Sequence, residues 1–294
     1  MSRSGSWAYR VVDVFTREPL QGNPLAVFPD GSGIDGPTMQ KIAREFNLSE
    51  TVFILPPTQA ECAVRLRIFT PTRELPFAGH PTIGTAFVLL SEGLVPPASE
   101  RFVLEEGVGP VPIRIEPGEP PLIWLRTPAI NWGRTYDRES CARGLGLGLD
   151  DLIEVTPQLL SAGNPTLFIA AKDKQAVDRA WLDLHGLSLI REDNEPLCVF
   201  VFTPTKVGAY SRMFAPEYGV AEDPATGSST GPLAAFMIKH GLVANSGGER
   251  FLSEQGTKMG RRSLLYVQVH GPEGVDGIDV GGYVAPFATG TMTI

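Results

Sequence analysis

The sequence predicts an α+β protein built from two similar halves, and three observations support this. The 294 residues are 43% hydrophobic and 20% charged, which is typical of globular domains. Segments with strand character mostly follow one another directly, and we expect only two helices in each half, unlike an alternating βαβ order. Short motifs also recur in the same order in both halves of the chain.

The repeated motifs lie about half a chain apart. They are Gly-Asn-Pro at 22–24 and 163–165, Arg-x-Phe-x-Pro at 67–71 and 212–216, and Gly-x-x-Thr-x-x-x-Ala at 79–86 and 227–234. Their offsets of 141, 145 and 148 residues grow slowly, as expected for a duplication with a few insertions. Two similar domains therefore form the expected architecture, with a cleft between them for a ligand.

The expected domain boundaries follow from this repeat. We expect a first domain at 1–125 and a second at 126–284, with the final strand, 285–294, returning to the first. The junction is placed in the Pro- and Gly-rich region 107–135.

In the first half, four apolar runs rich in β-branched residues are typical of strands. They are "YRVVDVF" (9–15), "PLAVFP" (24–29), "TVFILP" (51–56) and "AVRLRIFTP" (63–71). Asp35 as a cap and Pro37 in the first turn predict a helix that ends near Asn47. A second helix is expected from Pro81, with Ile83, Ala86, Phe87 and Leu90 on its apolar face.

The second half repeats this order of strands and a glycine-led helix. The expected strands are "PTLFIAA" (165–171), "LCVFVFTP" (197–204), "YSRMFAP" (210–216), "SLLYVQVHG" (263–271), "GIDVGGYV" (277–284) and "GTMTI" (290–294). A helix at 230–240 is predicted by Leu233, Phe236 and Met237, and Gly241 is expected to end it.

Both helices with a glycine start are candidate anion-binding sites. "FAGHPT" (77–82) and "PATGSST" (224–230) are turns that open a helix, where free backbone N–H groups and the helix dipole favour a negative ligand. The alternative is that Thr226, Ser228 and Ser229 only cap their helix. The duplication favours the ligand site, because both turns would then face one cleft.

Three ionisable residues near these turns are candidates for proton chemistry. Glu50 follows a helix among apolar neighbours, which would raise its pKa if the pocket closes, as a group that takes and returns a proton requires. His80 stands in the first glycine turn, and Asp223 precedes Pro224 in the second. The alternatives are a surface glutamate, a structural histidine and a carboxylate that stabilises a helix start.

Several classes of function are disfavoured by what the sequence lacks. A net charge of −8 argues against a broad nucleic-acid surface. No nucleotide-phosphate loop, zinc spacing or hydrolase elbow is found, so we expect no metal and no cofactor. No apolar run suits a membrane span and the first residues lack a signal-peptide core, while Cys62, Cys141 and Cys198 form no disulfide framework. A cytoplasmic location is expected.

Together, five stretches resemble the phenazine-biosynthesis isomerase (PhzF-like) family over nearly the whole chain. They are "VDVFT", "FNLSETVF", "RIFTPTRELPFAGHPTIGTA", "MFAPEYGVAEDPATGSSTGPLAAF" and "EQGTKMGRRSLLYVQV". The resemblance implies the diaminopimelate-epimerase-like fold, in which each of two pseudo-symmetric domains is a mixed β-sheet wrapped around a central helix. It also implies a homodimer and cofactor-independent proton transfer at carbon, as in the isomerisation of trans-2,3-dihydro-3-hydroxyanthranilate by the family's namesake.

Site roles follow from the same resemblance. By motif, Glu50 resembles the general acid/base, and His80 and Asp223 resemble its polar partners. Four further positions resemble the residues that bind the substrate carboxylate: Ser49, Gly79, Gly227 and Ser228. Ser229 departs from the motif, where an alanine is expected, and together with Pro232 is expected to alter substrate choice.

Two rival functions differ in their chemistry. A non-catalytic binder of small anionic metabolites would use the same helix starts without any proton transfer. A two-cysteine amino-acid epimerase is disfavoured, because neither glycine turn contains a cysteine.

Overall fold

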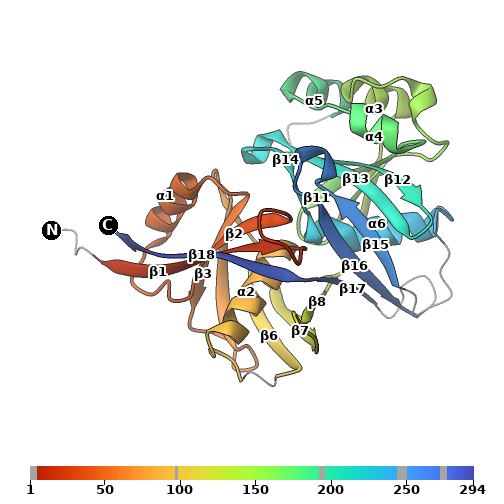
Figure 1. Ribbon diagram of the computed structural model, residues 1–294. Helices are drawn as coiled ribbons and strands as arrows, with labels where there is room; N and C mark the ends of the chain where they lie inside the picture. The colour runs from red at the N-terminus through yellow and green to blue at the C-terminus, as the bar shows by residue number, and fades with distance from the viewer. Residues whose placement is uncertain (1–4, 97–98, 192–195, 244–249, 272–276) are drawn as a thin grey trace. The chain divides into compact units, whose positions relative to one another are not determined.

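The computed structural model describes residues 5–96, 99–191, 196–243, 250–271 and 277–294. The chain folds into two compact units, the first comprising 1–126 and 281–294 and the second 127–280. Each unit combines a mixed sheet with helices, so the predicted α+β class is confirmed (Figure 1).

The first unit contains nine strands and two helices among its described residues. The strands are β1 (Ser6–Val14), β2 (Asn23–Phe28), β3 (Glu50–Leu55), β4 (Val64–Phe69), β5 (Glu74–Leu75), β6 (Arg101–Glu106), β7 (Gly109–Glu116), β8 (Leu122–Arg126) and β18 (Val284–Thr293). Helix α1 (Gly36–Phe46) packs on β3 and β4, and it covers an aromatic core that includes Phe28, Phe53 and Phe69. The last strand, β18, pairs with β1 in antiparallel fashion.

Helix α2 (Gly79–Ser91) is the central element of the first unit. It packs against β1, β2, β3, β8 and β18, so almost every side of it is buried. At Gly84 the fit is tight, because an added Cβ would lie 2.6 Å from Cδ2 of Leu25. The helix begins at Gly79 rather than at Pro81, since proline is tolerated in a first turn whose N–H groups have no helical partner.

Among the residues of the second unit that the structure describes, eight strands lie wholly within it. They are β9 (Asn131–Thr135), β10 (Gln158–Ser161), β11 (Pro165–Ala170), β12 (Cys198–Thr205), β13 (Gly208–Ala215), β14 (Val220–Asp223), β15 (Arg250–Gln255) and β16 (Ser263–His270). Strand β17 (Gly277–Gly282) starts in this unit as well. The central helix is α6 (Gly227–Lys239), which packs against β10, β11 and β16. It starts at Gly227, three residues earlier than predicted, and Pro232 lies inside it.

The strand pairing of the first unit recurs in the second. Parallel pairs β2–β3 and β4–β6 correspond to β11–β12 and β13–β15, and antiparallel pairs β3–β4 and β6–β7 correspond to β12–β13 and β15–β16. In both units the central helix follows a short strand in the chain and precedes a longer one. The order is β5, α2 and β6 in the first unit and β14, α6 and β15 in the second. The repeated sequence motifs therefore accompany a repeated topology.

One repeated motif has a visible structural role. Arg67 forms a two-pronged pair with Glu74, at 2.7 and 2.6 Å, and stacks over Phe69. Arg212 does the same with Glu222, at 2.8 Å for both contacts, and stacks over Phe214. The Arg-x-Phe-x-Pro motif thus ties each short strand to its neighbour.

The expectation of only two helices per half is wrong for the second unit. Helices α3 (Arg138–Gly144), α4 (Lys174–Arg179) and α5 (Leu184–Ile190) also form there, and they gather beside β12 and β13 (Figure 1). Six or seven residues are too few to display a clear helical period. A readable signal did exist, because each is capped by an aspartate whose carboxylate accepts a backbone N–H: Asp137, Asp173 and Asp183.

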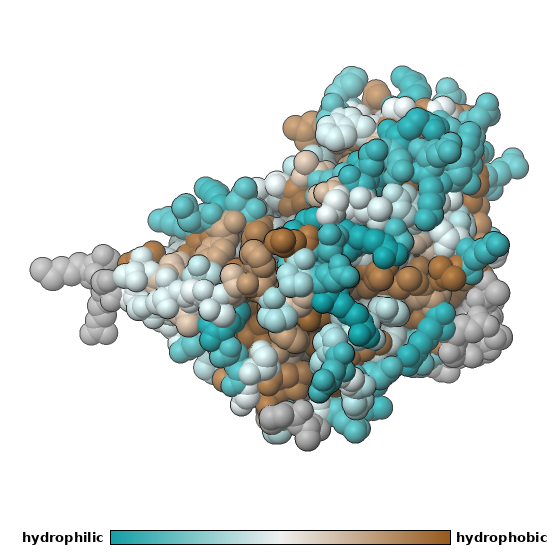
Figure 2. Space-filling model, viewed as in Figure 1, coloured by the Kyte–Doolittle hydropathy of each residue, from teal (hydrophilic) through white to brown (hydrophobic). Residues whose placement is uncertain are grey.

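The outer surface of these helices is polar. Figure 2 shows hydrophilic side chains predominating over the part of the second unit that contains α3, α4 and α5. Their inner faces contribute Cys141, Val177 and Leu187 to a core with β11, β12 and β13. Within the described residues, no helix is long and apolar enough to cross a membrane.

Candidate functional site

In the first unit, the structure brings Glu50 and His80 together. Oε2 of Glu50 lies 3.2 Å from Nε2 of His80, and their side chains are 14% and 4% exposed. Glu50 is the first residue of β3, and His80 is the second residue of α2, so the glycine turn delivers the imidazole to the edge of the strand. The pairing of these two predicted site residues thus has a direct structural basis.

Asn23 completes this cluster on the other side of the imidazole. Its Nδ2 lies 3.2 Å from Nδ1 of His80, and both residues are buried. An amide nitrogen only donates, so Nδ1 accepts and the ring hydrogen lies on Nε2, next to Glu50. The parallel register that aligns Leu25 with Glu50 explains why Asn23 and Glu50 share one edge of the sheet.

His80 is uncharged in this environment. Burial lowers the pKa of His80 to about 3, because the protonated imidazole would lose its hydration. Its contact with Glu50 is therefore the approach of a neutral ring N–H to a carboxylate. A neutral histidine can orient a carboxylate that exchanges protons without trapping it in a permanent ion pair.

The other predicted residues of the first unit adjoin this cluster in the chain. Ser49 immediately precedes Glu50 and is half-buried, while Gly79 is the first residue of α2 and is buried. As first residue of the helix, Gly79 has a backbone N–H without a partner in the helix ladder, which suits an anionic group.

In the second unit, Asp223 is the last residue of β14 and is buried. Its Oδ2 accepts a 2.6 Å hydrogen bond from the Thr226 hydroxyl. Thr226 is the cap residue of α6, so the carboxylate lies beside the start of that helix. Gly227 and Ser228 are the next two residues of the same turn and are also buried.

Gln255 holds this arrangement in place from the end of β15. Its Oε1 accepts from the backbone N–H of Thr226 at 3.1 Å, and its Nε2 donates to the backbone oxygen of Asp223 at 2.7 Å and to the Thr226 hydroxyl at 2.9 Å. Gln255 is fully buried, so all of its side-chain polar atoms are used in fixing Asp223 and the helix start.

Ser229, the departure from the family motif, has a partner in the protein. Its hydroxyl lies 2.9 Å from that of Thr166 on β11, and both residues are buried. The bond ties the start of α6 to the sheet of the second unit.

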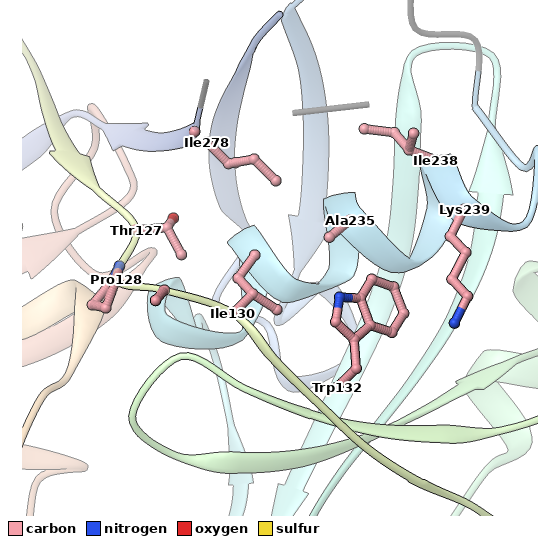
Figure 3. Close-up of a pocket in the computed structure, with 10 residues that line it drawn as sticks. Thr127, Pro128, Ile130, Trp132, Ala235, Ile238, Lys239 and Ile278 are labelled. Atoms are coloured by element: carbon pink, nitrogen blue, oxygen red, sulfur yellow. The ribbon is translucent and has the colours of Figure 1, made fainter. Parts of the chain in front are cut away.

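A separate cavity of about 660 Å³ lies along the C-terminal half of α6. Figure 3 shows Trp132 beside Lys239, whose ammonium group lies 4.1 Å from the ring centroid. None of the predicted site residues lines it. Ala235 and Lys239 are eight and twelve residues past Gly227, or about 12 and 18 Å along a helix, so this cavity is distinct from the helix start.

The three cysteines do not resemble a pair of catalytic thiols. All three are buried and lie outside the helix starts, and burial raises the pKa of Cys141 to about 12 and also raises the pKa of Cys62. A thiol with a raised pKa is a poor source of thiolate.

The structure also identifies residues that the sequence did not place in the site. Asn23 belongs to a repeated Gly-Asn-Pro motif, so a signal existed, but the motif alone did not reveal its contact with His80. Gln255 lies in the stretch "EQGTKMGRRSLLYVQV", which resembles the family, but its contact with the helix start depends on the parallel pairing of β13 with β15 and was not readable from the sequence.

Comparisons with known proteins agree with this fold. A family model described as "Phenazine biosynthesis-like protein" (PhzC-PhzF) matches residues 12–290. The trans-2,3-dihydro-3-hydroxyanthranilate isomerase of Pseudomonas aeruginosa is 38% identical over 292 residues, covering 96% of this chain and 98% of the relative.

Solved structures extend the similarity at the level of fold. The phenazine biosynthesis protein of the PhzF family from Bacillus anthracis aligns with a TM-score of 0.86 at 24% identity, covering 99% of this chain and 100% of its own. A hydroxyproline epimerase from Agrobacterium vitis aligns with a TM-score of 0.65 at 13% identity, over 98% of this chain and 93% of its own. The predicted diaminopimelate-epimerase-like fold is confirmed by these neighbours.

Proposed function

Since the chain belongs to the phenazine biosynthesis-like (PhzC-PhzF) family and is an isomerase, we propose that Glu50 is its general acid/base. In this proposal, Glu50 moves a proton between carbon atoms of a small metabolite that carries a carboxylate, without a cofactor. The observation that carries the proposal is the Glu50–His80–Asn23 cluster, in which the carboxylate lies 3.2 Å from a buried, uncharged imidazole.

The chemistry follows from this arrangement. The Glu50 carboxylate removes a proton from carbon, and the electron pair left behind is delocalised toward an unsaturated group of the substrate. Glu50, now an acid, delivers the proton to another carbon, so the isomerisation consumes no net acid or base. The neutral Nε2–H of His80 keeps the carboxylate oriented during both transfers.

Substrate binding is assigned to the two helix starts. Backbone N–H groups at Gly79 and Gly227, with the hydroxyls of Ser49 and Ser228, offer donors to a carboxylate. His80 and Asp223 serve as polar partners of the substrate. Support for these roles comes from the family motif and from the burial of all these residues, except the half-buried Ser49, in their own units.

The substrate class proposed is a cyclic, unsaturated amino or hydroxy acid. Its basis is the activity named for the Pseudomonas aeruginosa relative, which shares 38% of its residues with this chain. The rival reading, a binder without chemistry, predicts no proton exchange. A two-thiol epimerase is not supported, because the cysteines are buried away from the helix starts.

A deuterium experiment tests the proposed function. In heavy water, trans-2,3-dihydro-3-hydroxyanthranilate and a panel of related amino and hydroxy acids are incubated with the protein and analysed by mass spectrometry. We expect deuterium at carbon in at least one compound. If every compound binds but keeps all its C–H bonds, the binder reading replaces this proposal.

Chelation gives a second test, directed at the absence of a cofactor requirement. Among the described residues, no group of three His, Cys, Asp or Glu side chains could hold a metal ion. We expect the exchange rate to survive exhaustive dialysis against a chelator. Loss of exchange that added zinc or magnesium restores would contradict cofactor independence.

We also propose that the protein acts in the cytosol as a homodimer, without nucleic-acid or membrane partners. The three free cysteines support a location in the cytosol. The net charge of −8 supports the absence of a nucleic-acid partner. Family resemblance supports the dimer.

A further inference from the structure

Glu106 is a buried acidic residue that the proposed chemistry does not use. It is the last residue of β6, and its carboxyl lies behind the first turn of α2. The Thr82 hydroxyl, in that turn, is 2.6 Å from Oε1 of Glu106 and 2.8 Å from the backbone oxygen of Ala78. The backbone N–H of Ala78 also bonds to the Glu106 carboxyl.

This position matters because Ala78 caps the helix that carries His80. The methyl side chain of Ala78 cannot cap α2, and no neighbouring side chain in the turn does so. The Glu106 carboxyl, from the end of a distant strand, is the partner of the Ala78 N–H instead. Behind it, the Val108 N–H donates to the Pro76 oxygen at 3.0 Å, so the β6–β7 turn also holds the chain that enters the helix.

The second unit contains the same device, built with an uncharged residue. Gln255 ends β15 as Glu106 ends β6, and it accepts the N–H of Thr226, the cap residue of α6. The Thr230 hydroxyl donates to the Thr226 oxygen at 2.9 Å, just as Thr82 contacts the Ala78 oxygen.

The glycines that follow these two residues also correspond. A Cβ added to Gly107 would lie 2.7 Å from Cα of Pro76, and a Cβ added to Gly256 would lie 2.5 Å from the backbone oxygen of Pro224. Each glycine therefore lies against the chain that enters the central helix of its unit. Glu106 is thus the counterpart of Gln255 in contacts, in strand position and in the glycine that follows.

We propose that Glu106 is a positioning residue for the candidate active site, fixing the helix start that carries Gly79 and His80 just as Gln255 fixes the start of α6. The proposal rests on the proposed function for the role of His80. Glu106 itself touches neither the substrate nor Glu50 in this scheme.

The number of hydrogens available shows which protonation state of Glu106 holds the helix start. The single hydrogen of the Thr82 hydroxyl cannot serve both the Ala78 oxygen and Glu106. In the acid form, Glu106 donates to Thr82, and Thr82 then donates to Ala78, so both short contacts are satisfied. Oε2 of Glu106 is buried without a hydrogen-bond partner among the described residues, which also disfavours a charge there.

The surroundings agree with an uncharged Glu106. Burial raises the pKa of Glu106 to about 8, against smaller opposing effects of the hydrogen bonds with Thr82 and Ala78. The charged or titratable groups on the elements around it are Arg65 and Arg67 on β4, Glu74 on β5, Glu105 and, farther along, Arg101 on β6, His80 on α2 and, farther along β7, Arg114 and Glu116. An uncharged cap leaves the positive potential of the helix start available to an anionic substrate.

Three variants test the proposal. Glu106→Gln installs the amide that the second unit uses, Glu106→Ala removes the cap, and Glu105→Gln is the matched control on the same strand. Glu105 binds the Thr58 backbone N–H and hydroxyl instead, away from α2. We expect Glu106→Ala to lower kcat by at least about tenfold, and Glu106→Gln to restore at least a third of the wild-type kcat at about pH 6.

The pH dependence separates positioning from a merely structural role. The folded pKa of about 8 lies above the unfolded value of 4.5, so the carboxyl stabilises the fold fully below the unfolded pKa, and this contribution is lost as pH rises toward the folded pKa. The Tm of Glu106→Gln should therefore rise relative to wild type between about pH 5 and pH 8. Because ionisation of Glu106 would disturb the helix start, the kcat/KM of the wild type should fall as the pH approaches about 8. This fall should be absent in Glu106→Gln and present in Glu105→Gln.

Infrared spectroscopy provides a readout that needs no substrate. The wild type at neutral pH should show the C=O band of a buried carboxylic acid, and Glu106→Gln should lack it. Absence of this band, or full activity in Glu106→Ala, would overturn the proposal. If the wild type binds the panel but exchanges no C–H, the proposed function fails, while the infrared and unfolding results still decide the state of Glu106.

Discussion

Glu50→Gln is expected to lower the rate of deuterium exchange by at least about 10²-fold, the low end for losing a general acid/base. The glutamine amide keeps the shape of the side chain and a carbonyl oxygen, but it cannot accept a proton from carbon. Substrate affinity should change by less than about tenfold, or about 1.4 kcal/mol. Single-turnover exchange and calorimetric binding to the same variant measure the two effects separately.

Glu45→Gln serves as the matched control for this variant. Glu45 lies on the exposed surface of α1, five residues before Glu50. It should leave both exchange and binding close to wild type. Exchange at a wild-type rate in Glu50→Gln would remove Glu50 from its assigned role.

Asp223→Asn is expected to lower kcat/KM by about 10- to 10²-fold, with contributions from both KM and kcat. The asparagine oxygen can still accept from Thr226, so the helix start of α6 should remain intact. What is lost is the negative charge assigned to contact with the substrate. Asp150→Asn, at an exposed position, is the matched control.

The double variant Glu50→Gln/Asp223→Asn distinguishes cooperation from independence. Residues that act on one chemical step are strongly non-additive, so the double variant should be little worse than Glu50→Gln alone. If Asp223→Asn alone abolishes exchange while Glu50→Gln keeps it, Asp223 is the base and the assignment of Glu50 is wrong.

Much of the fold was accessible from the sequence because its signals are local or repeated. Apolar runs rich in β-branched residues identified β1 to β4, and the Asp35 cap with Pro37 identified α1. The helices α3 to α5 escaped because each spans only two turns. The starts of α2 and α6 were placed too late, since burial on all sides, rather than local propensity, extends these helices through glycine and proline.

The sequence by itself determined the family, the repeated plan of the chain and the motifs that carry Glu50, His80 and Asp223. Only the tertiary structure decided how these residues are held, since their partners come from other strands. Parallel pairing of β2 with β3 sets Asn23 beside the cluster, and the pairings of β4 with β6 and of β13 with β15 carry Glu106 and Gln255 to the two helix starts. Burial at those positions, which no local pattern reveals, keeps His80 neutral and raises the pKa of Glu106.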